Sequence, residues 1–105
     1  MKKLTALCAA LLAASCLTTT VLAGQSAGAA AFEANCSECH YGGGNSVNPA
    51  KNLRSLTLKA NGITSAQDIV AKMRNPGPGM TRFEPKELPD KEALEIAEYI
   101  LATFK

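Results

Sequence analysis

The sequence predicts a small all-α domain, and three observations support this fold class. The stretches 26–40, 64–74 and 90–104 place apolar side chains three or four positions apart, which is the spacing of one helix face. Clusters of glycine and proline separate these stretches. No stretch alternates apolar and polar residues as strands do, and no segment is repeated. We therefore expect about four helices in a single domain.

The first 23 residues have the pattern of a secretory signal peptide. Met1-Lys2-Lys3 is positively charged, the run from Leu4 to Leu22 carries no charge, and Val21-Leu22-Ala23 fits a cleavage site. We expect cleavage after Ala23, which leaves one domain at residues 24–105. Two alternatives stay open: an uncleaved membrane anchor, because the run is just long enough to span a bilayer, and a lipoprotein acylated at Cys16.

Cleavage changes the composition that matters for function. Cys8 and Cys16 leave with the leader, so only Cys36 and Cys39 remain and no disulfide framework is expected. The basic residues fall from 11 to 9 and balance the 9 acidic ones, which gives no electrostatic support for nucleic-acid binding. A domain of 82 residues has a thin apolar core of its own.

The first helix is expected to start at Ser26 as its N-cap and to run into the cysteine pair. Gly28 lies one turn before Phe32, where a missing side chain would let another helix approach, although a frayed helix start explains the glycine equally well. The glycine-rich segment 41–45 ends this helix, and Asn48-Pro49 continues the loop.

Three shorter patterns complete the fold. Leucines at 53, 56 and 58 mark a short element that Asn61-Gly62 stops. Residues 64–67 resemble a capping box that opens a helix through about Arg74, and 75–79 break it. A last helix starts near Asp90. The expected buried faces of these two helices are Ala66, Ile69, Val70 and Met73, and Ala93, Ile96, Ala97, Ile100 and Phe104.

The motif that carries chemistry is Cys36-Ser37-Glu38-Cys39-His40. Two cysteines three apart, followed by histidine, form the attachment pattern of a c-type haem. Positions i and i+3 share a helix face, so both thiols can reach the two vinyl groups of one porphyrin edge, and His40 can bind the iron. A redox disulfide lacks its supporting βαβ pattern, and a structural zinc site needs four ligands where the mature chain offers three.

A second axial ligand decides whether the sixth coordination position of the haem iron is occupied or open to small ligands. His40 is the only histidine, which leaves Met73 and Met80 as sulfur donors after cleavage. Met73 lies on the buried face with Ile69, so core packing explains it. Met80 follows Pro76-Gly77-Pro78-Gly79, which cannot be helical and can approach a flat ligand closely. The sequence favours Met80 as the ligand, and methionine raises the potential.

These residues give the chain a family likeness: it resembles a class I monohaem cytochrome c and is similar to the cytochrome c6 or c553 group. Gly28, Phe32 and Tyr99 stand where that family has its glycine and aromatics on the crossing first and last helices. Met80-Thr81-Arg82-Phe83 takes the place of the family's Met-Pro-Ala-Phe. The resemblance implies about four helices wrapped round one covalently attached haem, and an exposed haem edge near the Cys36 thioether.

The resemblance also suggests roles beside the iron. Pro49 matches the family's proline whose carbonyl accepts a hydrogen bond from the axial imidazole, and such a partner would fix the tautomer of His40. Arg82 departs from the family pattern, and either a haem propionate or solvent accounts for it.

We thus expect a periplasmic electron carrier, not an enzyme, that docks transiently with redox partner proteins, has no membrane anchor and is a monomer. The rival is a haem peroxidase or gas sensor with an open or labile sixth site. Six basic residues and one acid lie in 51–82, and six acids and two lysines in 84–98. This asymmetry would orient docking, or it reflects solvated helix faces.

Overall fold

The computed structural model describes the backbone of residues 19–105 and the side chains from residue 27 onward. These residues form five α-helices and two 3-10 turns and contain no strand, which confirms the all-α prediction. The leader as far as residue 18, with Cys8 and Cys16, lies outside the described residues. Within those residues no helix has both the length and the apolar character needed to cross a membrane.

The first helix, α1 (Thr19–Asn35), begins seven residues before the expected N-cap, so the prediction of a start at Ser26 was wrong. Residues 19–25 are mostly apolar or small and contain no proline or charge, and nothing in them interrupts a helix. The cysteine motif lies on a separate turn, α2 (Ser37–His40), followed by η1 (Tyr41–Gly43). This separate turn is why five helices are found where about four were expected.

The middle of the chain follows the sequence closely. After η2 (Pro49–Lys51) come α3 (Ser55–Ala60), which ends at Asn61-Gly62, and α4 (Ala66–Arg74). The capping box of α4 is shifted by one residue from its expected place. The Ser65 hydroxyl accepts from the Asp68 amide, and the Asp68 carboxylate accepts from the Thr64 amide.

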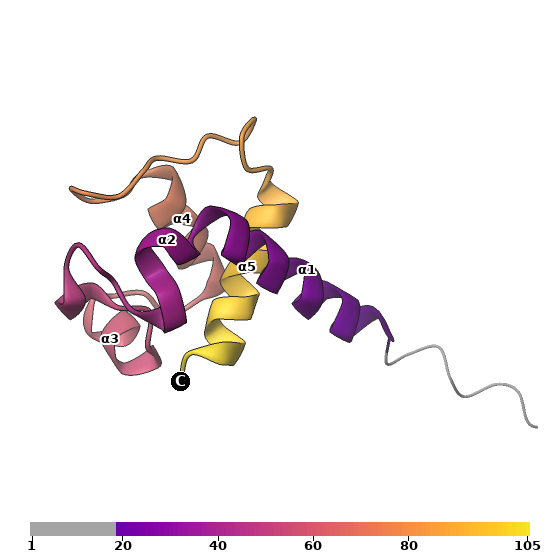
Figure 1. Ribbon diagram of the computed structural model, residues 1–105, viewed down its shortest axis with the longest axis horizontal. Helices are drawn as coiled ribbons and strands as arrows, with labels where there is room; N and C mark the ends of the chain where they lie inside the picture. Colours follow the sequence, from indigo (N-terminus) through magenta and orange to yellow (C-terminus); the bar gives the residue numbers. More distant parts are fainter. Residues whose placement is uncertain (1–18) are drawn as a thin grey trace, which may run out of the picture.

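The last helix, α5 (Asp90–Thr103), is the centre of the packing, because α1 and α4 both lie against it (Figure 1). All five residues expected on its buried stripe are buried, with Phe104 just beyond the helix end. The stripe of α4 is confirmed too: Ile69 and Met73 are buried, and Ala66 and Val70 pack partly buried against the core.

An aromatic cluster holds the crossing of α1 and α5. The Phe32 ring lies 5.4 Å from the rings of both Tyr99 and Phe104, measured between centroids. Gly28 faces the same crossing, where an added Cβ would meet the Glu95 carbonyl oxygen. This contact decides the question about Gly28 in favour of close helix packing.

Candidate functional site

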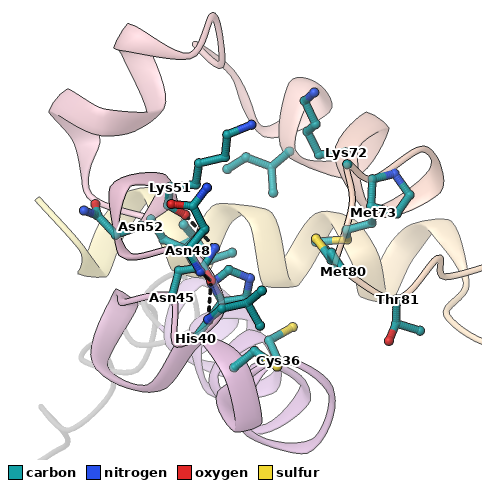
Figure 2. A pocket seen from close by; sticks show the side chains of 18 of the residues that line it. Cys36, His40, Asn45, Asn48, Lys51, Asn52, Lys72, Met73, Met80 and Thr81 are labelled. Carbon is teal, nitrogen blue, oxygen red and sulfur yellow. Dashed lines mark hydrogen bonds between the residues drawn. The ribbon is translucent and has the colours of Figure 1, made fainter.

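A single cavity of about 530 Å³ brings the predicted chemical groups together. Its walls include both cysteines of the motif, His40 and Met80, although Met80 lies forty positions after the histidine. Figure 2 shows His40 and Met80 on different walls of this space. The fold therefore places a nitrogen donor and a sulfur donor at one site.

The turn α2 positions the motif. The amides of Cys39 and His40 both donate to the Cys36 carbonyl, at 3.2 and 2.8 Å, which closes the turn. Cys36 is half-buried and burial raises the pKa of its thiol to about 11, so this thiol is neutral at pH 7. Cys39 is exposed, and these two cysteines form no disulfide with each other. The expected exposed haem edge near the Cys36 thioether stays a prediction.

His40 has a defined tautomer. Its Nδ1 lies 2.8 Å from the Gly44 carbonyl oxygen and donates to it, because a carbonyl can only accept. The Nε2 atom then carries a lone pair that can bind a metal. Pro49 was expected to supply this carbonyl, and that prediction was wrong. Gly42 and Gly43, at φ of 62° and 83°, turn the chain so that Gly44 reaches the imidazole first.

The two methionines occupy different environments. Met73 is 4 % exposed and belongs to the core, as the sequence indicated, whereas Met80 is 37 % exposed. Met80 lies in the long connection between α4 and α5, after Gly79 with φ of 90°. Both side chains line the cavity. Of these two methionines, only Met80 lies outside the buried core, so core packing does not account for it.

The floor of the cavity is apolar. It is formed by buried core residues from α3, α4, α5 and the connection before α5, namely Leu58, Ile69, Met73, Leu88 and Ile100. A flat apolar group would cover side chains that otherwise face the cavity.

Two lysines on the cavity wall were missed by the sequence reasoning. Lys51 and Lys72 line the cavity, and neither forms a salt bridge within the described residues. Figure 2 shows both at the side away from Cys36. Arg82 does not line the cavity. Its guanidinium lies 3.4 Å from the Asn75 side-chain oxygen, so the structure favours the solvent role over a propionate contact.

Asn45 shapes the loop beside the histidine and was also missed. Its side-chain oxygen accepts from the Val47 and Asn48 amides at 3.0 and 2.8 Å, and its nitrogen donates to the Lys51 carbonyl at 3.0 Å. Asn45 therefore helps to place Lys51. The spacing of Asn45 and Asn48 is an Asx-turn signal that could have indicated this.

The residues present fit a covalently attached haem. The volume is in the range of small-molecule sites, about 300–1,000 Å³, the floor is apolar, and the walls supply two thiols, an imidazole and a thioether. Over the described residues, no group of three or more His, Cys, Asp or Glu side chains is placed to hold a metal ion by itself.

The chain is similar in sequence to known cytochromes. The family model described as cytochrome c oxidase, cbb3-type, subunit III matches residues 23–100. The chain is 41 % identical over 87 residues to cytochrome c6 of Rippkaea orientalis, covering 82 % of this chain and 78 % of that protein.

Two solved structures show the same fold. The outer membrane cytochrome F of Geobacter sulfurreducens matches with a TM-score of 0.73 and 44 % identity, over 74 % of this chain and 99 % of that one. Cytochrome c6 of the diatom Phaeodactylum tricornutum matches with a TM-score of 0.69 and 32 % identity, over 74 % and 91 %.

Proposed function

Because the chain belongs to the cytochrome c family as a relative of the cytochromes c6, we propose that it is an exported electron carrier with histidine and methionine as its axial iron ligands. The chain is a monohaem c-type cytochrome, an electron carrier and not an enzyme. Its haem iron supplies the chemistry, by accepting one electron and returning it.

Four side chains hold this group in the proposal. Cys36 and Cys39 form the two thioethers, His40 binds iron through Nε2, and Met80 binds it through sulfur. The observation that carries the proposal is that all four line one cavity although they come from two distant parts of the chain. The Gly44 carbonyl supports it, because the bond to Nδ1 orients the ring and leaves Nε2 free.

Lys51 and Lys72 face the two haem carboxylates in this proposal. Among the described residues neither ammonium group forms a salt bridge, and both line a cavity whose floor is apolar. They lie away from Cys36 (Figure 2), as the propionates lie away from the vinyl edge. Replacing both by glutamine should lower the reduction potential, because lost positive charge favours the ferric form. Lys86→Gln, exposed and outside the cavity, is the control, and potentiometric titration measures the difference.

Export to the periplasm, by a leader cleaved after Ala23, is part of the same proposal. The sequence pattern of residues 1–23 supports it. N-terminal sequencing of the native protein tests it, since a start at Gly24 excludes both an uncleaved anchor and a lipid on Cys16.

Partner proteins dock transiently with a monomer in this proposal, over a small interface, as redox encounters usually do. In this proposal electrons enter and leave through an exposed haem edge near the Cys36 thioether, as the family likeness implies.

Spectroscopy of the ferric and ferrous protein tests the ligand set. Iron bound by methionine sulfur shows a characteristic charge-transfer band in the ferric state, and a six-coordinate ferrous iron does not bind carbon monoxide. Both results are expected at neutral pH. A high-spin ferric centre, or carbon monoxide binding by the native ferrous protein, would favour a peroxidase or gas sensor instead.

A further inference from the structure

The connection that carries Met80 has few ties of its own. Residues 77–82 are all exposed, and the Met80 amide reaches the Gly77 carbonyl only at 3.5 Å, which is a long hydrogen bond. Figure 1 shows this connection extending away from the helices between α4 and α5. The position of the Met80 sulfur therefore depends on how the two ends of the connection are held.

Within this connection, the two ends of the segment 75–82 that carries Met80 both lie beside the last turn of α4. The Phe83 amide donates to the Met73 carbonyl at 2.9 Å, and Arg74 Nη1 donates to the Phe83 carbonyl at 3.0 Å. The other guanidinium nitrogen, Nη2, lies 2.7 Å from the Asp90 carboxylate at the first turn of α5. Arg74, at the end of α4, is thus bonded both to Phe83, directly after the segment 75–82, and to Asp90 at the start of α5.

We propose that Arg74 is a positioning residue for Met80. Its bonds to the Phe83 carbonyl and the Asp90 carboxylate hold the connection where Met80 lines the cavity. The proposal rests on the proposed role of Met80 as an iron ligand. A planar guanidinium suits this role because its nitrogens donate in two fixed directions, here to a carbonyl and to a carboxylate. The Arg74 side chain is 20 % exposed, and its bond to the Phe83 carbonyl is partly buried, whereas its bond to Asp90 lies at the surface.

Without the two interactions of the Arg74 guanidinium, residues 75–82 would gain conformational freedom. The hydrogen bond between Phe83 and Met73 would remain, but the Phe83 carbonyl would lose its charged donor. A hydrogen bond to a charged group stabilises more than a neutral one. The sulfur would then spend more time away from the iron, although no residue of the cavity has been changed.

The test compares Arg74→Gln with Arg82→Gln in the holoprotein. Arg82 is the matched control because it is an exposed arginine of the same connection with one 3.4 Å contact. For Arg74→Gln we expect ferrous protein that binds carbon monoxide at a rate at least about tenfold above the detection limit at which the native protein shows no binding. We also expect its ferric charge-transfer band to disappear, on heating, at a lower temperature than the band of the native protein. Arg82→Gln should match the native protein in both measurements.

Two further variants keep the test decisive if Arg74→Gln folds poorly. Arg74→Lys retains the charge but has one nitrogen, so it should give an intermediate rate. Asp90→Asn weakens the ion pair but leaves the bond to the Phe83 carbonyl, so it should have a smaller effect than Arg74→Gln.

The outcomes separate this inference from the proposed function. If Arg74→Lys and Arg74→Gln bind no more carbon monoxide than the native protein but unfold at a lower temperature, Arg74 only stabilises the fold, and the inference alone is overturned. A native protein without the charge-transfer band would overturn both. A purely structural role would not change ligand binding by the folded protein.

Discussion

At the scale of single residues, Met73 and Met80 have the same side chain but lie in different environments. Met73 packs in the core at 4 % exposure, whereas Met80 lines the same cavity from a connection that packs little. The sequence separated them correctly by environment, because Met73 shares a helix face with Ile69 and Met80 follows a run that cannot be helical. Their roles can be separated by substitution.

Met80→Ala should open the sixth iron site. We expect loss of the ferric charge-transfer band, a lower reduction potential, because the sulfur ligand raises it, and carbon monoxide binding by the ferrous form. Met73→Leu nearly conserves side-chain volume and is the control, for which the band should persist. Visible spectroscopy and potentiometric titration measure these effects. An unchanged spectrum in Met80→Ala would show that another side chain binds the iron.

Gly28→Ala should weaken the crossing of α1 and α5. The added Cβ would meet the Glu95 carbonyl oxygen and the Tyr99 Cβ, and both belong to a packed helix that cannot easily move. Overpacking of this kind typically costs about 1–3 kcal/mol, which urea denaturation of the holoprotein would measure. Gly77→Ala, whose Cβ would meet nothing within 4 Å, is the control and should change the unfolding free energy little. Equal stabilities would contradict this packing.

At the scale of elements, the helices with a clear stripe were predictable. The last helix and α4 combine periodic apolar residues with acidic first turns and proline or glycine at their borders. The start of α5, the end of α4 and both buried faces were found, and the cap of α4 was misplaced by one residue. The start of α1 was missed because its first residues carry no stop signal, so the capping preference of Ser26 was outweighed. Leu56 on α3 is 82 % exposed, which a poorly periodic stretch could not reveal.

The cap of α4 predicts a pH effect on stability. Hydrogen bonds hold the pKa of Asp68 below its ordinary value, first from the Thr64 amide and then from the Ser65 hydroxyl. A carboxyl with a lowered pKa in the folded state contributes stability that is present above its unfolded pKa and is lost as the pH falls through its folded pKa. The unfolding free energy should therefore fall below about pH 4.

Asp68→Asn tests this contribution. The amide cannot ionise, so the difference in unfolding free energy between the native protein and the variant should shrink as the pH is lowered through this range. Glu98→Gln, on an exposed part of α5, is the control. Denaturation measured at several pH values gives the difference. A difference that is constant with pH would contradict a role for the Asp68 charge.

At the scale of the whole molecule, the site was only partly predictable. The motif fixed Cys36, Cys39 and His40 locally, because their spacing alone defines their common turn. The lysines and the Gly44 carbonyl could not be found this way. Only the tertiary fold brings Lys51 and Lys72 to the same cavity. The Gly44 contact depends on the positive φ of Gly42 and Gly43, which the sequence does not specify. Local chemistry was visible, and the surroundings depend on long-range packing.

The same packing predicts that the fold depends on the haem. The core of the described residues has eleven buried apolar side chains, and five of them form the cavity floor. Only Leu88 and Ile96 are large and almost completely buried. With so thin a core, the floor needs an apolar group to cover it, as small metal domains need their metal.

Removal of the haem should therefore unfold most of the chain. In a variant with both Cys36→Ala and Cys39→Ala, purified without haem, we expect far-UV circular dichroism to show much less helix than in the holoprotein. Residual helix should come from α1 and α5, because the rings of Phe32, Tyr99 and Phe104 pack together without using the cavity. Substituting Phe32→Ala in this background should remove most of the residual helix signal. Native helix content with cooperative thermal unfolding in the haem-free variant would show that the protein side chains suffice for the fold.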